Sequence, residues 1–221
     1  MITRIYFWKI PRYRALWAIT HMALDRRNLR RDLAIGFWKL LGTGKGETFT
    51  PRDADATRWG LLITITEAEL PRFENSKLMK RWNRNADSHF SATLRPISVH
   101  GSWSKKVPFV SEPEFSNWTG PIAAITRARI KTRKNLIFWR SVPPVTTALH
   151  QADGLVSAIG IGEAPLGLQG TFSIWRDAKA VREFAYRGAA HQSAIAATAR
   201  EAWYAEELFA RFALVDQRGA L

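Results

Sequence analysis

The stretch KKVPFVSEPEFSNWTGP (residues 105–121) divides the chain into two halves that carry the same predicted order of elements. It holds three prolines. Each proline fixes φ and lacks a backbone N–H, so neither a helix nor a central strand continues through the stretch. We interpret residues 105–120 as a linker between an N-terminal unit, residues 1–104, and a C-terminal unit, residues 121–221.

On both sides of this linker, runs rich in β-branched and aromatic residues predict strands, and longer amphipathic stretches predict helices. The N-terminal unit is predicted to contain strands at 2–10, 36–44, 58–66 and 89–99, with helices at 12–33 and 67–86. The C-terminal unit is predicted to contain strands at 121–131, 155–163, 168–175 and 207–216, with helices at 133–152 and 177–205. Pro143 and Pro144 are expected to interrupt the helix at 133–152.

Each unit therefore follows the order strand, helix, strand, strand, helix, strand. This order is that of a ferredoxin-like unit, in which a four-stranded antiparallel sheet carries helices on one face. The opposite face of each sheet needs a cover, and two such sheets can cover one another. The sequence thus predicts an α+β fold in which two tandem ferredoxin-like units form a pseudo-dimeric α+β barrel.

The composition excludes several kinds of site. The chain of 221 residues has no cysteine, which rules out disulfides, thiolate-bound haem, cysteine iron–sulfur clusters and zinc fingers. It has 33 Lys and Arg against 19 Asp and Glu, for a net charge of +14, which attracts anionic partners. No apolar run approaches the length of a membrane-spanning helix. We expect a cytoplasmic protein that touches the inner membrane only peripherally.

His191 interrupts the apolar side of the predicted helix at 177–205. A helical projection places it on one face with Val181, Phe184, Gly188, Ile195 and Thr198. Gly188 lies about one turn earlier and leaves a clearing in which a flat macrocycle would fit. Trp175 and Phe184 would then supply aromatic walls. Two interpretations stay open from spacing alone: an axial haem ligand, or a core histidine bonded to a carbonyl or an acid.

Arg127 and Arg129 lie two residues apart on the strand predicted at 121–131, so they face the same side of the sheet. Inside the barrel they would bind haem propionates or polarise a bound oxygen species. Outside it they would belong to the solvated surface. The alternation of a strand does not decide between these two faces.

Several unusual blocks in the chain resemble the spheroidene monooxygenase family of carotenoid biosynthesis. They occur in order over nearly the whole length. The blocks are GFWKLLGTGKGETFTP (36–51), LRPISVHGSW (94–103), GPIAAITRARI (120–130), IGIGEAP (159–165), TFSIWRDA (171–178) and EAWYAEELFARF (201–212).

The resemblance implies an oxygenase that contains haem b and uses O2 and a reduced ferredoxin or similar electron donor. Its substrate would be a lipophilic polyene, an acyclic carotenoid oxidised at C-2 to a 2-keto product. The family is also similar to ferredoxin-like haem proteins such as aldoxime dehydratases and small haem-degrading monooxygenases. Their recurring order of Trp, Phe and His matches Trp175, Phe184 and His191, which implies that His191 is the axial ligand of the haem iron in the C-terminal unit.

No motif identifies a residue that activates oxygen. Arg127 and Arg129 are catalytic candidates by position, and Phe37, Trp38 and Lys39 are candidates for a substrate pocket. The basic helical stretch ALDRRNLRRDL (23–33) would adhere to an anionic membrane or dock an acidic ferredoxin.

Other functions stay open as well. The scaffold would also suit a haem dehydratase, an oxygenase of another lipophilic substrate, or a haem-binding protein without catalytic activity. A nucleic-acid module is disfavoured, because the chain has no RNP1 motif.

Overall fold

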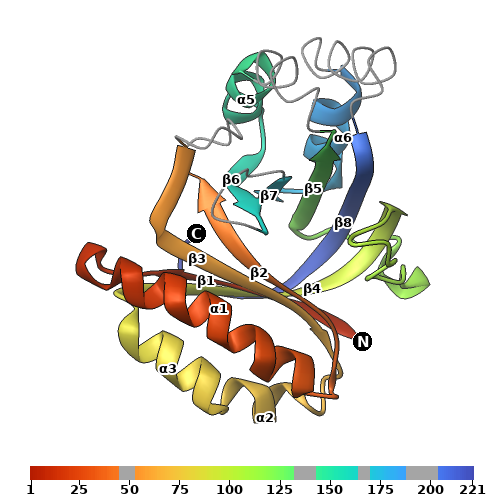
Figure 1. Cartoon of the computed structure of the whole chain (residues 1–221). Coiled ribbons are helices and arrows are strands. Elements are labelled where there is room, and N and C mark those ends of the chain that lie inside the picture. The colour runs from red at the N-terminus through yellow and green to blue at the C-terminus, as the bar shows by residue number, and fades with distance from the viewer. Residues whose placement is uncertain (45–52, 132–142, 164–169, 188–203) are drawn as a thin grey trace.

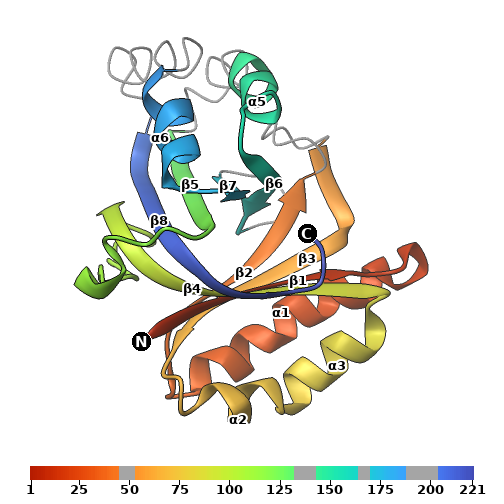
Figure 2. The same cartoon turned by 180° about the vertical axis from the view of Figure 1, so that it is seen from behind.

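Eight strands close into a single antiparallel barrel in the computed structural model of the chain (Figures 1 and 2). The structure describes residues 1–44, 53–131, 143–163, 170–187 and 204–221, with the backbone alone at 143–146 and 186–187. Around the barrel the strands follow the order β1-β3-β2-β6-β7-β5-β8-β4.

The N-terminal unit has the predicted order of elements, with one helix divided in two. Its elements are β1 (Ile2–Lys9), η1 (Arg12–Arg14), α1 (Ala15–Arg31), β2 (Ile35–Gly44), β3 (Ala54–Ile65), α2 (Leu70–Glu74), α3 (Lys77–Asn85) and β4 (Ser88–Gly101). The break within the predicted helix at 67–86 falls at Ser76, whose hydroxyl accepts a hydrogen bond from the backbone N–H of Met79 at 3.3 Å. Ser76 is thus the N-cap of α3, which satisfies a donor that the first turn of a helix leaves free.

The C-terminal unit repeats the arrangement. Its elements are β5 (Ile122–Ile130), α5 (Pro143–His150), β6 (Leu155–Gly162), β7 (Gly170–Trp175), α6 (Ala178–Arg187) and β8 (Tyr204–Arg218). α5 begins at Pro143, where the missing N–H of a proline costs nothing in the first turn of a helix. Residues 132–142 lie outside the described residues, so the predicted interruption of a longer helix by Pro143 and Pro144 stays a prediction. The predicted helix at 177–205 runs too far, since Tyr204 already belongs to β8.

The two sheets meet along two seams. β4 pairs with β8 from Ser91↔Arg218 to Gly101↔Leu208, and among the described residues β2 pairs with β6 from Gly42↔Gly162 to Gly44↔Gly160. Within each sheet the fourth strand pairs with the first, the first with the third, and the third with the second. The predicted tandem of ferredoxin-like units is therefore confirmed, and both sheets lose their free edges on closure.

Large apolar side chains fill the interior of the barrel. Phe7 lies with its ring centroid 5.8 Å from that of Phe172 and 6.2 Å from that of Phe90. Phe109, from the segment predicted as the linker, is only 2% exposed and packs 5.0 Å from Phe212. The barrel interior is thus a packed core rather than a pore.

A second core lies between the N-terminal sheet and its helices. Trp8 of β1 packs against Trp82 of α3, with ring centroids 5.1 Å apart. Asp25 of α1 is fully buried, accepts a hydrogen bond from the indole N–H of Trp82 at 2.8 Å and is paired with Arg81. This buried carboxylate joins α1 to α3, so the two helices form one layer on the sheet (Figure 1).

Candidate functional site

Strand alternation decides which way Arg127 points. Ile125, on the same face of β5, belongs to the barrel core, and Arg127 follows it toward one end of the interior. Its side chain is only 4% exposed, whereas Arg129 on the same face of the strand is exposed. The two arginines thus share a face, as alternation requires, but differ in their surroundings.

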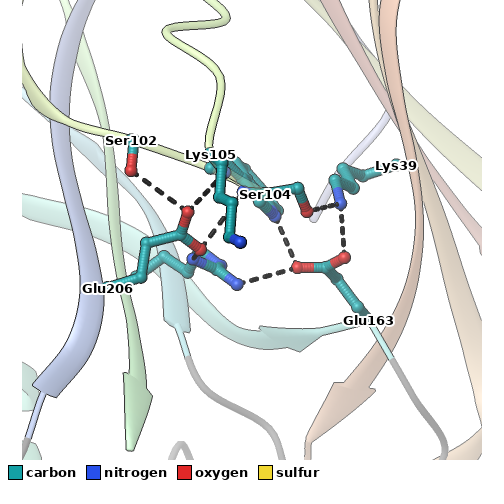
Figure 3. A network of polar contacts seen from close by, with 8 residues as sticks. Lys39, Ser102, Ser104, Lys105, Glu163 and Glu206 are labelled. Atoms are coloured by element: carbon teal, nitrogen blue, oxygen red, sulfur yellow. Dashed lines mark hydrogen bonds and ion pairs between the residues drawn. The ribbon is translucent and has the colours of Figure 1, made fainter.

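Two carboxylates hold the buried guanidinium of Arg127. It donates to Glu206 at 2.6 Å and to Glu163 at 3.0 Å, and it lies 5.4 Å from the ring centroid of Trp103. Neither carboxylate was predictable as a partner of Arg127, since Glu206 and Glu163 lie 79 and 36 residues away along the chain. We call these four residues, together with Lys39, the mouth cluster; Figure 3 shows its two carboxylates, Lys39 and the neighbouring serines.

Glu163 connects β6 to β2 within this cluster. It accepts hydrogen bonds from the indole N–H of Trp103 at 2.6 Å and from the ammonium group of Lys39 at 2.5 Å. Burial raises the pKa of Glu163, but the hydrogen bonds from Lys39 and Trp103 outweigh it, so the net pKa is lowered. Glu163 is therefore ionised at neutral pH and bridges the β2–β6 seam between the two sheets.

Glu206 connects β8 to the turn that follows β4. Its carboxylate accepts from the backbone N–H of Lys105 at 2.6 Å and of Ser104 at 3.1 Å. Ser104 and Lys105 have φ values of 56° and 61°, in the left-handed region that residues other than glycine rarely adopt. Burial raises the pKa of Glu206, but the backbone N–H of Lys105 and the guanidinium of Arg127 outweigh it and bring the pKa to about 2.

The mouth cluster has no room for a large ligand. The cavity beside it, lined by Leu41, Ile161 and members of the cluster, has a volume of ≈ 10 Å³, which is room for one water at most. Two cations face two ionised carboxylates, so the charges are balanced. The mouth cluster is therefore better suited to holding the strands together at one end of the barrel than to acid–base catalysis.

The outer face of the C-terminal sheet is different, because its side chains are short. Two adjacent rows cross β6, β7 and β5 in register, and we call them the shelf. One row is Ala158, Ser173 and Ala124, and the next is Gly160, Thr171 and Thr126. At typical strand spacing the shelf spans about 10 Å by 7 Å between backbone positions.

The matching face of the N-terminal sheet has no such shelf. One row across β2, β3 and β1 consists of Leu40, Leu61 and Tyr6, all of which are buried. Those large side chains pack under α1, α2 and α3. Among the described residues the two units therefore share a fold but differ in the size of the side chains on these rows, which are large in the N-terminal sheet and small on the shelf.

Two of the residues that the sequence singled out meet at one end of the shelf. Trp175 lies in the next row, and its ring centroid is 5.2 Å from that of Phe184 on α6. The indole N–H of Trp175 donates to the hydroxyl of Ser173 at 2.9 Å. Gly188 and His191 lie outside the described residues, so their predicted role beside Trp175 and Phe184 stays a prediction.

Arg127 lies on the other side of the sheet from this pair. Arg127 points into the barrel, whereas Trp175 and Phe184 lie on the outer face among α5 and α6. The structure therefore separates the catalytic candidates from the candidates for the haem pocket. The catalytic role of Arg127 and Arg129 stays a prediction.

The three residues proposed for a substrate pocket are also separated by strand alternation. Phe37 belongs to the barrel core, Trp38 packs against the core on the helix side, and Lys39 belongs to the mouth cluster. Phe37 lies with its ring centroid 5.8 Å from that of Trp103. The three side chains therefore do not line one pocket together.

Arg211 is a shelf neighbour that sequence reasoning missed. It stands beside Ala124 in the register of β5 and β8, and its Nε donates to the hydroxyl of Ser98 at 2.9 Å. Within the described part of the chain it has no carboxylate partner. The alternation of ELFARFALVD (207–216) places Phe209, Arg211 and Ala213 on one face, which is the signal that would have found it.

No family model matches the chain. Three curated relatives do match, and each is named spheroidene monooxygenase. The protein of Rhodobacter capsulatus is 38% identical over 210 residues, which cover 92% of this chain and 86% of the relative. That of Cereibacter sphaeroides is 36% identical and covers 92% and 63%, and that of Rubrivivax gelatinosus is 37% identical and covers 83% and 70%.

Solved structures match the fold. An aldoxime dehydratase aligns over 97% of this chain and 81% of its own with a TM-score of 0.60, at 11% sequence identity. At this identity the likeness concerns the fold alone. At the level of architecture, this likeness confirms the predicted similarity to aldoxime dehydratases.

Proposed function

The chain belongs to the spheroidene monooxygenase family, and we propose that it is a haem-dependent monooxygenase that oxidises an acyclic carotenoid at C-2 to a 2-keto product. The family makes the chain an oxidoreductase of the monooxygenase class. The names of the relatives support a substrate related to spheroidene. A monooxygenase also needs two electrons per turnover, for which we propose a ferredoxin-type donor.

The observation that carries the haem proposal is the shelf. A haem is flat and largely apolar, so it needs a surface from which no large side chain projects. The barrel interior and the outer face of the N-terminal sheet are both filled with large side chains. On the shelf the half-buried Ala124 and Ala158 flank the small Ser173, which fits the face of a macrocycle.

Further residues around the shelf fit the edges of the ring. Trp175 and Phe184 form an aromatic wall at one end. Arg211, fixed by Ser98, provides a cation suited to a propionate group. We propose His191 as the axial ligand on the strength of the sequence pattern. It is the histidine of the order Trp175, Phe184, His191, and the chain has no cysteine to take its place.

Bound haem would supply the site at which O2 is activated. The chain itself would exclude water and hold the polyene so that C-2 is presented. Each hydroxylation consumes one O2, two electrons and two protons, places one oxygen atom on carbon and releases the other as water. A second hydroxylation at the same carbon followed by loss of water gives the ketone.

Filling the shelf tests this proposal. Ala124→Leu and Ala158→Leu are expected to reduce haem binding at least tenfold, measured as the Soret absorbance during haem titration of the purified protein. Val156→Leu is the matched control, because Val156 lies on the same strand as Ala158 and is 63% exposed. Equal haem binding by the control and the two shelf variants would place the haem elsewhere.

Co-expression with an acyclic carotenoid pathway tests the substrate. The expected result is a new keto-carotenoid, detected by its absorption and mass, that depends on the protein. A haem-loaded protein that forms no such pigment would instead favour a haem enzyme with another substrate or a haem-binding protein without catalytic activity.

A further inference from the structure

The outward surface of α1 and α3 carries cations without balancing acids. The exposed cations are Arg26, Arg27, Arg30, Arg31, Lys77, Lys80 and Arg84. The one acid within α1, Asp25, is buried against Arg81 and Trp82, and the sequence of α3 contains none. Within the described part of the chain, none of these seven cations is paired with a carboxylate. We call this surface the basic helix layer.

Exposed apolar side chains lie among these cations. Tyr13 is 80% exposed, Leu16 76%, Leu24 59% and Leu33 98%. With Ile19 they make five of the eleven large exposed hydrophobic residues in the described part of the chain. Such a concentration on one helix and its two ends indicates a surface that meets an apolar partner.

The exposed residues of α1 lie on one side of the helix. With 3.6 residues per turn, Leu16, Arg27 and Arg31 project in similar directions, while the buried Ala18, Asp25 and Leu29 project to the opposite side. The helix is about 25 Å long, so the outward face is extended rather than a single spot. This face offers exposed apolar side chains and cations together, and membrane binding strengthens with both the apolar area buried and the attraction to anionic lipids.

We propose that the basic helix layer binds the surface of an anionic lipid bilayer. The arginines and lysines would lie at the level of the anionic headgroups, and Leu16, Leu24 and Leu33 would enter the boundary with the acyl chains. A nucleic acid or an acidic polymer such as polyglutamate would use the cations alone and would leave the exposed leucines in water. None of the helices that the structure describes is long and apolar enough to cross a membrane.

The layer lies at the opposite end of the molecule from α5 and α6 (Figures 1 and 2). Binding through it would therefore leave the shelf side of the C-terminal unit away from the bilayer surface. The layer is thus an anchor that orients the protein, separate from the proposed haem site. This inference requires neither haem nor substrate.

Vesicle sedimentation of the full chain tests the proposal. The wild type is expected to bind vesicles made of equal parts phosphatidylcholine and phosphatidylglycerol, to bind pure phosphatidylcholine weakly, and to be released by high salt. The triple variant Arg27→Gln, Arg30→Gln, Arg31→Gln is expected to bind the anionic vesicles roughly 100-fold more weakly, at about fivefold per cation. The double variant Leu16→Ser with Leu24→Ser is also expected to bind the anionic vesicles more weakly than the wild type. Unlike the loss caused by removing cations, this loss should not depend on the salt concentration.

The matched control removes the same charge elsewhere. Lys106, Lys179 and Arg218 are exposed and lie outside the layer, so changing all three to Gln is expected to lower vesicle binding less than threefold. Equal losses in the two triple variants would show that net charge alone drives binding, and would overturn the proposal. So would a wild type that binds polyglutamate but not anionic vesicles. Because the vesicles hold no carotenoid and the protein is assayed without haem, these outcomes are independent of the oxygenase activity.

Discussion

At the barrel mouth a single carboxylate, Glu206, holds a turn and a cation that come from distant parts of the chain. Ser104 and Lys105 adopt left-handed backbone conformations that cost energy, and both donate their N–H groups to Glu206. Arg127, buried in the barrel, needs the same carboxylate to balance its charge. The single ionised carboxylate of Glu206 thus stabilises both the turn and the buried cation.

Glu206→Gln is expected to lower the free energy of unfolding at neutral pH by about 1–3 kcal/mol, because hydrogen bonds to a charged acceptor become bonds to a neutral one. The pKa of Glu206 is lower in the folded protein, about 2, than its ordinary value of 4.5. Its contribution is therefore present above that ordinary value and is lost as the pH falls toward 2. Urea unfolding across this pH range should show the difference from wild type shrinking as the pH falls.

Glu207→Gln is the matched control for this prediction. Glu207 is the next residue on β8, and its side chain is 36% exposed and lies near His100 rather than Arg127. A control that loses as much stability as Glu206→Gln, or a difference that does not vary with pH, would show that the low pKa of Glu206 has no structural consequence.

Among the secondary-structure elements, α1 and α3 depend on a buried charge as well as on apolar packing. Asp25 accepts hydrogen bonds from Arg81, Trp82 and Asn28. No apolar side chain at position 25 would satisfy these donors. The order of the elements was predictable from the sequence, but this contact was not, because Asp25 and Arg81 are separated by 56 residues and neither stands in a motif.

Asp25→Ala is expected to destabilise the protein by about 2–4 kcal/mol, because it leaves the buried indole N–H of Trp82 and the half-buried guanidinium of Arg81 without their acceptor. The measurement is the midpoint of urea unfolding followed by tryptophan fluorescence, since Trp82 lies at the site of the change. Asp87→Ala, at an exposed acid just after α3, serves as the control and should change stability by less than about 0.5 kcal/mol. Comparable losses in the two variants would argue against a special role of Asp25.

Strand alternation explains which parts of the site could be predicted. It places Arg127 and Arg129 on one face of β5, whereas Phe184 lies near Trp175 because α6 packs on the sheet. It does not say which face of a strand looks into the barrel, because both faces of these sheets are covered by apolar layers. A single substrate pocket was predicted for Phe37, Trp38 and Lys39, although strand alternation alone divides these residues between the two faces of the sheet.

At the scale of the whole molecule, the described residues hold the two seams of the barrel in different ways. Lys39 of β2 and Glu163, next to β6, form an ion pair across the β2–β6 seam. The β4–β8 seam is paired along the backbone from Ser91 to Gly101 of β4. The tandem repeat in the sequence predicts that the two sheets meet, but it does not identify the side chains that join them.

Lys39→Met is therefore expected to open the β2–β6 seam selectively. Amide hydrogen exchange at Gly42–Gly44 and Gly160–Gly162 should become about tenfold faster, which corresponds to about 1.4 kcal/mol of local stability. Exchange at the β4–β8 seam should stay unchanged. Faster exchange at both seams would indicate a general loss of stability instead, and Lys9→Met, at a cation outside the mouth cluster, provides the reference.

The central claim is that the C-terminal unit binds haem on its outer face with His191 as axial ligand, and an absorption spectrum tests it most directly. Purified protein reconstituted with haem b should show a Soret band, and His191→Ala should abolish or shift that band while the far-ultraviolet circular dichroism stays that of the wild type. His150→Ala, at the end of α5, should leave the band unchanged. A wild-type protein that binds no haem, or a His191→Ala variant with an unaltered Soret band, would contradict the account.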